Sequence, residues 1–149
     1  AAPIASLPCA MGSTRRFTPT SEWEDERQLL GLEGERLALA YLTACGWAVE
    51  AHRFRLGRHD VDLVIRRGTL VAFVEVKTRR SDAFGSPLEA VSVRKQRHIA
   101  KAAALWILRH GRSDDVYRFD LVGVQQHRRG EPTIEHLEDA WRPDAWVGR

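Results

Sequence analysis

The chain has 149 residues, enough for one domain to bury a hydrophobic core without disulfides or a structural metal. Its hydrophobic fraction of 44% and charged fraction of 29% are those of a globular protein, and no apolar run is long enough to span a membrane. We therefore expect a soluble protein with no membrane partner. The two cysteines, Cys9 and Cys45, form no disulfide or zinc-binding pattern, which favours a reducing, cytoplasmic location.

The net charge of +3 conceals an uneven distribution of charge along the chain. Residues 51–101 hold twelve Lys or Arg against five Asp or Glu, so the rest of the chain is acidic. One basic face of this kind is typical of a nucleic-acid-binding protein. Solvated arginines in an arginine-rich proteome would give the same pattern, and charge alone does not decide between the two.

The N-terminal part of the chain is predicted to be a tail, a helix and a strand. Residues 1–20 should form a flexible tail without chemistry. Ser21 and Glu24 have the spacing of a capping box, which starts a helix predicted over about 22–45. Alternating residues then indicate a first strand over 47–56.

The middle of the chain is predicted to form a β-hairpin. Its arms are residues 60–65 and 70–78, and Arg66-Arg67-Gly68 is expected to form the turn. The second arm is rich in β-branched and aromatic residues, which favours a central position in a sheet.

After a loop at 81–88, Ser92 is predicted to cap a long helix that runs to about His110. One side of this helix is apolar and the other is basic. Residues 116–124 read as a strand, 134–139 as a short last strand, and 141–149 as a tail. The resulting α-β-β-β-α-β order predicts an α/β fold with a mixed sheet flanked by helices, in a single domain over 21–140.

Three ionisable residues on the predicted hairpin are candidates for metal-dependent chemistry. In a strand, Glu75 and Lys77 project from one face, and the hairpin brings Asp62 towards them. Phosphodiester hydrolysis needs a hard divalent cation, for which carboxylates are suitable ligands. We expect Asp62 and Glu75, with the carbonyl of Val76, to bind Mg²⁺ or Mn²⁺, and Lys77 to orient water and balance developing charge.

The alternative is that these three residues form cross-strand ion pairs on the wet face of a sheet. Their setting favours the catalytic interpretation, because the strands are otherwise apolar and basic residues surround the motif. The basic residues expected to contact nucleic-acid phosphates are Arg53, Arg55, Arg58, Arg79 and Arg80.

Four longer blocks of sequence carry a family resemblance. They are GLEGERLALAYL (31–42), RHDVDLVIRRGTLVAFVEVKTRR (58–80), FGSPLEAVSVRKQRHIAKAA (84–103) and YRFDLVGV (117–124). Together they resemble the YraN-type proteins of bacteria, which are similar to archaeal Holliday-junction resolvases within the PD-(D/E)XK, or restriction-endonuclease-like, superfamily. The resemblance implies that fold, a Mg²⁺- or Mn²⁺-dependent nuclease site, and a homodimer by analogy with the resolvases.

The resemblance also implies roles for residues that the pattern alone would not select. Glu35 is implied to be an additional active-site carboxylate, where an ordinary solvated helix residue is the alternative. Asp60 replaces a glutamate that is usual in the family and is implied to support the metal site. Lys95 and Gln96 on the long helix are implied to orient the nucleophile or bind phosphate, and Asp120 to pair with an arginine in a structural role.

The predicted function is therefore that of a metal-dependent endonuclease acting on DNA, with branched or damaged DNA as the expected substrate. No helix-turn-helix or zinc finger suggests base-specific reading. One alternative is a non-catalytic nucleic-acid-binding or adaptor protein on the same fold, since a basic surface suits both. Another is an interaction protein that uses exposed tryptophans to bind a protein partner.

Overall fold

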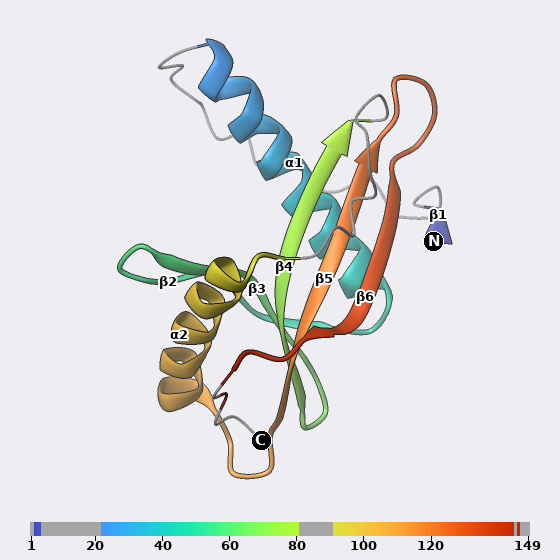
Figure 1. The fold of residues 1–149 in the computed structure, drawn as a ribbon. Coiled ribbons are helices and arrows are strands. Elements are labelled where there is room, and N and C mark those ends of the chain that lie inside the picture. Colours follow the sequence, from blue (N-terminus) through green and yellow to red (C-terminus); the bar gives the residue numbers. More distant parts are fainter. Residues whose placement is uncertain (1, 4–21, 81–90, 145, 147–149) are drawn as a thin grey trace.

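The computed structural model describes residues 2–3, 22–80, 91–144 and 146, with side chains from Gln28 onward (Figure 1). The elements in chain order are β1 (Ala2–Pro3), α1 (Glu22–Ala44), β2 (Ala48–Leu56), β3 (His59–Arg67), β4 (Leu70–Arg80), α2 (Val93–His110), β5 (Val116–Gln126) and β6 (Thr133–Trp141). Neither helix is long and apolar enough, over the residues described, to cross a membrane.

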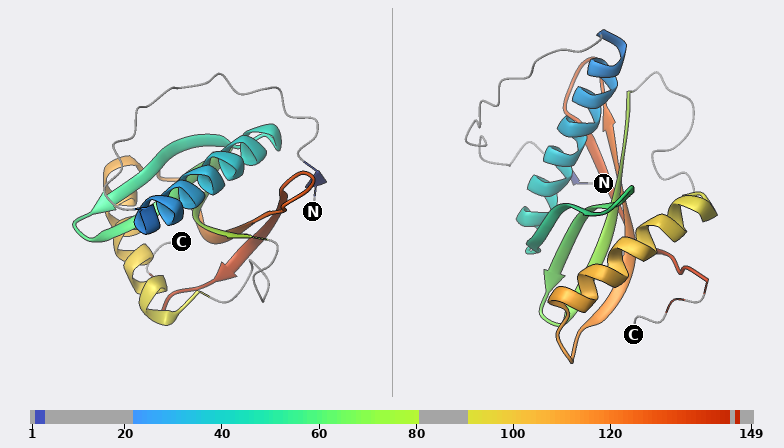
Figure 2. Two further views of the ribbon diagram at one scale, coloured as in Figure 1. Left: turned by 90° about the horizontal axis from the view of Figure 1, so that it is seen from above. Right: turned by 90° about the vertical axis from the view of Figure 1, so that its left-hand side faces the viewer.

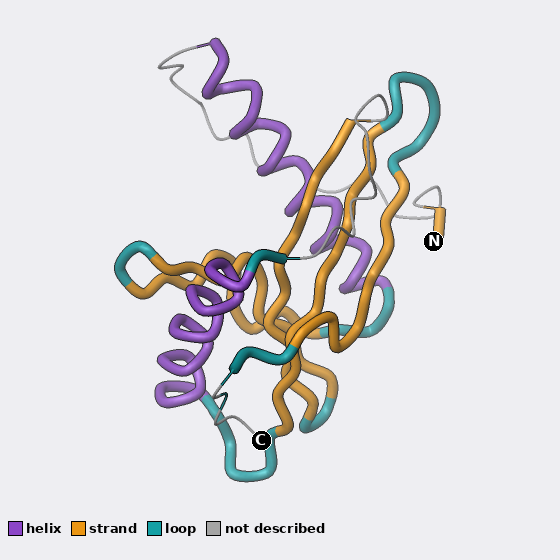
Figure 3. The backbone as a smooth tube through the Cα atoms, in the orientation of Figure 1, coloured by secondary structure: helices purple, strands orange, loops and turns teal. Residues whose placement is uncertain are grey.

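The strands form one mixed sheet in the order β1-β6-β5-β4-β3-β2. Only β4 and β5 run parallel among these neighbours, and α2 provides the crossover between them (Figure 3). The other neighbouring pairs are antiparallel. The predicted α-β-β-β-α-β order and the mixed α/β sheet are confirmed, and the architecture is that of a restriction-endonuclease-like fold.

The two helices lie on opposite faces of the sheet, as the two views in Figure 2 show. Helix α2 packs Ile99 and Trp106 into a core that contains Phe73 and Phe119. Helix α1 packs Leu37 and Leu42 into a second core on the other face, with members that include Leu63 and Val74. The centre of the sheet is thus covered on both faces, which is why β3 and β4 contain nearly continuous apolar runs.

The predicted start and end of the long helix are confirmed. The Ser92 side chain accepts a hydrogen bond from the backbone N–H of Lys95 at 3.2 Å, and the helix ends at His110 with Gly111 as its C-cap. The expected capping box at Ser21 and the expected loop at 81–88 lie outside the described residues.

The predicted position of the hairpin turn is wrong by about two residues. Strand β3 continues through Arg67, and the turn is formed by Gly68, whose φ is +61°, and Thr69. Arg66 is a buried strand residue, not a turn residue. Its guanidinium pairs with Glu50 and with Asp115, at 2.9 Å for Nη2 to Oδ2, and these partners compensate its charge inside the fold.

The C-terminal part is more ordered than the sequence pattern suggests. Strand β6 extends to Trp141, beyond the predicted 134–139, and the Trp141 side chain is buried. The Trp146 ring lies 4.7 Å from the Phe119 ring, centre to centre. Both tryptophans therefore contribute large apolar surfaces to the core on the α2 side.

Candidate active site

The site lies where strand β3 separates from β4. The two strands pair from Arg67 and Leu70 as far as Leu63 and Val74, after which β3 pairs only with β2. The backbone N–H of Val76 therefore has no backbone acceptor on β3, and it donates instead to Asp62 Oδ2 at 2.8 Å. This hydrogen bond holds the Asp62 carboxylate beside β4 next to Glu75.

At Arg53, which lies opposite Asp62, the alternation of side chains between the two faces of strand β2 is interrupted. Arg53 has a φ of +54°, a left-handed conformation that costs a non-glycine residue of order 1 kcal/mol. Ala51 and Phe54 both pack against the core on the α2 side although they are three residues apart. The Arg53 guanidinium meanwhile pairs with Glu35 of α1. The part of the β2–β3 hairpin beyond the pairing with β4 projects between the two helices (Figures 1 and 2).

Gly34 determines how closely α1 approaches this part of the sheet. A Cβ atom at Gly34 would lie 2.8 Å from Cβ of Thr78 on β4 and would overlap the Thr78 hydroxyl. Only a glycine permits this separation of helix and strand without a shift. The next residue, Glu35, is consequently held against β2 with only 8% of its surface exposed.

Glu35 reaches the site but is already paired. Its carboxylate accepts from Arg53 Nε at 2.9 Å and lies 2.9 Å from His52 Nε2. Its negative charge also contributes to raising the pKa of Asp62, so the two carboxylates are electrostatic neighbours. Arg53, expected to contact phosphate, is thus engaged within the protein.

Asp62, which is half-buried, and Glu75, which is buried, are adjacent acids that destabilise each other's charge. Burial, and then the neighbouring Asp62 carboxylate, raises the pKa of Glu75 to about 8. Burial also raises the pKa of Asp62 to about 6, against the lowering effect of the hydrogen bond from Val76. Glu75 is 9% exposed, and its buried Oε2 has no hydrogen-bond partner. Both acids would be stabilised as carboxylates by a cation bound between them.

Two lysines near these acids differ in their contacts. Lys95 on the first turn of α2 places Nζ 3.6 Å from Asp60 Oδ1 and 3.8 Å from Glu75 Oε1. Burial lowers the pKa of Lys95, but Glu75 and the other acids more than offset this and leave it raised. Lys77 shares a face of β4 with Glu75, yet its ammonium pairs with no other described side chain. The structure therefore brings Asp62, Glu75, Asp60 and Lys95 together.

The other residues expected to bind nucleic acid are spread around this cluster. Gln96 uses its side-chain amide to donate to the carbonyl of Val91 at 2.9 Å, so it anchors the start of α2. Arg55 and Arg58 are exposed on the β2–β3 hairpin, where Arg58 lies in its turn. At the end of β4, Arg79 is half-buried and Arg80 is exposed. Along the chain, Arg55 and Arg58 precede Asp60 and Asp62, and Arg79 and Arg80 follow Glu75.

Sequence reasoning did not identify a pair of histidines whose rings contact each other, tilted by 45°, at the edge of the site. The rings of His59 and His98 lie 4.4 Å apart, centre to centre, between the start of β3 and α2. His59 precedes Asp60, and His98 lies one helical turn after Lys95. The helical spacing of Lys95 and His98 indicates that both face the hairpin, but nothing in the sequence pairs them with His59.

The donor set fits a hard divalent cation with an incomplete protein coordination shell. No group of three or more Asp, Glu, His or Cys residues converges as a complete metal site within the described part of the chain. Mg²⁺ commonly binds one or two carboxylates and takes its remaining ligands from water and substrate phosphate. Asp62 and Glu75 supply two carboxylates, one with an unpartnered oxygen, and the Val76 carbonyl is adjacent in the chain.

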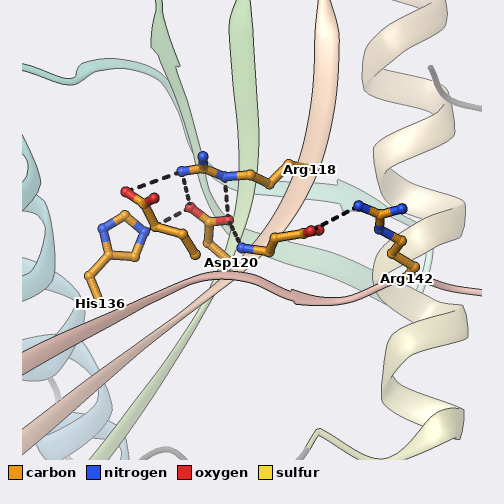
Figure 4. Close-up of polar contacts among 6 residues, drawn as sticks. Arg118, Asp120, His136 and Arg142 are labelled. Carbon is orange, nitrogen blue, oxygen red and sulfur yellow. Dashed lines mark hydrogen bonds and ion pairs between the residues drawn. The ribbon is translucent and has the colours of Figure 1, made fainter.

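Asp120 lies outside this cluster and is fully buried on β5 (Figure 4). It accepts hydrogen bonds from Arg118 at 2.8 and 2.9 Å, and from the backbone N–H of Asp139 at 2.9 Å, and it lies 2.7 Å from His136 Nε2. Burial raises the pKa of Asp120, but the hydrogen bonds from His136 and Arg118 outweigh this and lower it. The expected pairing with an arginine is confirmed, and the contacts are those of a structural residue.

The sheet topology and its flanking helices place the protein in the class of restriction-endonuclease-like α/β domains. The chain belongs to UPF0102, an uncharacterised protein family that includes the YraN-type proteins, and the family model matches residues 34–124. The match begins at Gly34 and covers Asp60, Asp62, Glu75 and Lys95, which together form the acidic cluster. The resemblance drawn from the sequence is thereby confirmed.

Similar proteins from several bacteria extend over most of this chain. A UPF0102 protein of Geotalea uraniireducens is 40% identical over 121 residues, which is 81% of this chain and 95% of the relative. One from Geobacter sulfurreducens is 40% identical and covers 83% of this chain and 96% of its own length. A third, from Anaeromyxobacter dehalogenans, is 43% identical and covers 82% and 93%. Their shared name specifies no activity.

Proposed function

We propose that the protein is a divalent-cation-dependent endonuclease that hydrolyses phosphodiester bonds in DNA. The observation that carries the proposal is the pair of adjacent acids, half-buried Asp62 and buried Glu75, at the point where β3 leaves β4. Two adjacent acids that both have a raised pKa, one of them with a buried oxygen that has no hydrogen-bond partner, are unusual in a protein unless a cation binds there.

Each residue of the cluster would have a distinct role. Asp62 and Glu75 would hold Mg²⁺ or Mn²⁺, which when bound supplies the Lewis acidity that phosphodiester hydrolysis requires. The hydrogen bond from Val76 fixes the orientation of Asp62. Lys77, two residues beyond Glu75 on the same strand face, is available to orient the attacking water and balance charge on the phosphate. Glu35 would assist by holding Arg53 beside the acids.

The surroundings of the site suit a phosphate backbone. Arg55 and Arg58 project on the β2–β3 hairpin, and Arg94 and Arg97 are exposed on α2. These cations would bind phosphates largely without reading bases. Branched or damaged DNA remains the proposed substrate, by analogy with the junction resolvases.

The proposal is tested by incubating linear duplex, single-stranded and four-way-junction DNA with the protein and Mg²⁺ or Mn²⁺. Wild type should cut at least one substrate, whereas Asp62→Asn and Lys77→Ala should each lose about 100-fold or more of the rate. Lys101→Ala, a lysine exposed on α2, is the matched control for loss of one positive charge. Cleavage that is unchanged in Asp62→Asn would refute the proposed site.

A second candidate function, DNA binding without cleavage, is favoured by the absence of an ion pair at Lys77 within the described part of the chain. Its ammonium pairs with none of the described acids, and Lys95 occupies the position beside Glu75 instead. A protein of this kind would bind DNA with a steep dependence on salt and no dependence on metal. Filter binding in EDTA and in Mg²⁺, at two salt concentrations, separates the two functions.

A further inference from the structure

Lys95 is the described lysine that forms ion pairs inside the acidic cluster. Its ammonium lies between Asp60 on β3 and Glu75 on β4, at 3.6 and 3.8 Å from their oxygens. These distances exceed those of a good charge-assisted hydrogen bond, which are about 2.7–2.9 Å. The ammonium therefore compensates the acids by charge, without a tight hydrogen bond to either.

We infer that Lys95 is an internal counter-cation, whose ammonium occupies the metal-free site and is displaced when a divalent cation binds to Glu75 and Asp62. The inference rests on the proposed function, because it concerns the same cation site. It adds a competition between the protein's own positive charge and the metal. Two cations do not share a carboxylate oxygen at close range without repulsion.

The anchoring of α2 makes such a displacement possible without a change of fold. The Ser92 side chain caps the backbone at Lys95, and the Gln96 side chain is bonded to Val91, so the first turn of the helix is fixed on both sides of Lys95. The Lys95 side chain itself is 38% exposed and has four flexible methylenes. Its ammonium can leave the acids by rotamer changes alone.

Arg53 is not equivalent to Lys95 in this respect. Its guanidinium is held by two hydrogen bonds to Glu35, at 2.9 and 3.3 Å, and its backbone is locked in a left-handed conformation. It stays in place when the cation binds. Lys95 is thus the positioned charge that can move from the acids to an incoming phosphate.

The test is the affinity of the full-length protein for Mn²⁺ in the absence of DNA, measured by calorimetry. Lys95→Met should bind Mn²⁺ at least about tenfold more tightly than wild type, because the competing ammonium is gone. Lys95→Arg, which keeps a positive charge, should stay within about threefold of wild type, and so should the control Lys101→Met on the same helix. Thermal unfolding gives a second readout. In EDTA at pH 8, Lys95→Met should melt below wild type, and saturating Mn²⁺ should remove most of that difference.

The outcomes distinguish this inference from the proposed function. Equal or weaker Mn²⁺ binding by Lys95→Met, with wild type still binding, would overturn the inference and leave the nuclease proposal intact. A wild type that fails to bind Mn²⁺ while Lys95→Met binds it would support the inference strongly. Absence of binding by both proteins would refute the competition and the metal-dependent function together.

Discussion

Replacing Glu75 by glutamine is expected to stabilise the metal-free protein at alkaline pH. Glutamine has the shape of the protonated acid, so the substitution removes a buried charge and leaves packing unchanged. The pKa of Glu75 is raised from its ordinary 4.5 to about 8, first by burial and then by Asp62. The folded protein thus binds a proton that the unfolded chain releases.

The sign and size of the effect follow from this difference. Between pH 4.5 and about 8 the folded state holds more protons than the unfolded state, so stability falls as pH rises through that window. At about 1.4 kcal/mol per pKa unit, the shift corresponds to about 5 kcal/mol as an upper limit. Relaxation of the partly open site should reduce this, and we expect about 2 kcal/mol in favour of Glu75→Gln at pH 9.

The assay is urea unfolding of wild type and Glu75→Gln in EDTA at pH 5, 7 and 9. The two proteins should have similar free energies of unfolding at pH 5 and diverge as pH rises. Glu135→Gln, a half-exposed glutamate on β6, is the matched control and should show no such divergence. Added Mg²⁺ at pH 9 should stabilise wild type more than Glu75→Gln. A variant less stable than wild type at pH 9 would refute the reasoning.

Three further substitutions test the framework around the site. Gly34→Ala should lower the free energy of unfolding, measured in urea, by about 1–3 kcal/mol, because the added Cβ would collide with Thr78. A second change, Thr78→Ala, should restore part of this loss. If Gly34→Ala has no effect, α1 is not held by this contact. Arg66→Met should lower the free energy of unfolding by about 3 kcal/mol, since it leaves the buried Asp115 carboxylate without its arginine partner. The double variant with Asp115→Asn should lose less than the sum of the two single variants. Asp120→Asn should cost about 2 kcal/mol at pH 7. Because the folded pKa of Asp120 is lowered, that difference should shrink as pH falls below its ordinary 3.8, and a constant difference down to pH 2.5 would contradict the assignment.

The elements of the fold could be predicted because their patterns are local. The cap at Ser92 and the apolar stripe of α2 are set by neighbours within one or two helical turns, and both were found at the expected residues. The hairpin turn was placed wrongly because Arg66 has a charge that is usual at a surface. Its buried partner Asp115 lies 49 residues away, and no local pattern indicates such a pairing.

The residue types of the candidate site could be predicted from the sequence, but the pairings among these residues could not. The alternation in β4 places Glu75 and Lys77 on one face, and Asp62 falls on the adjacent arm of the hairpin. The separation of β3 from β4 coincides with the left-handed conformation of Arg53 on β2, which no sequence pattern predicts. Lys95, and not the expected Lys77, pairs with Glu75. This pairing depends on how α2 packs against the sheet, and residues 20 positions apart in the sequence give no local sign of it.

Because of the hydrogen bond from Val76 to Asp62, we expect position 62 to tolerate fewer substitutions than position 75. Position 62 continues the sheet where the β3 backbone has departed, so a relative that no longer needed a catalytic site would still require an acceptor there, such as Asn or Ser. The side chain at position 75 accepts no such backbone hydrogen bond, and an apolar residue there would remove a buried acid whose Oε2 has no partner. Under the proposed function, replacement of Glu75, more than of Asp62, is therefore expected in a relative that has lost the cation site.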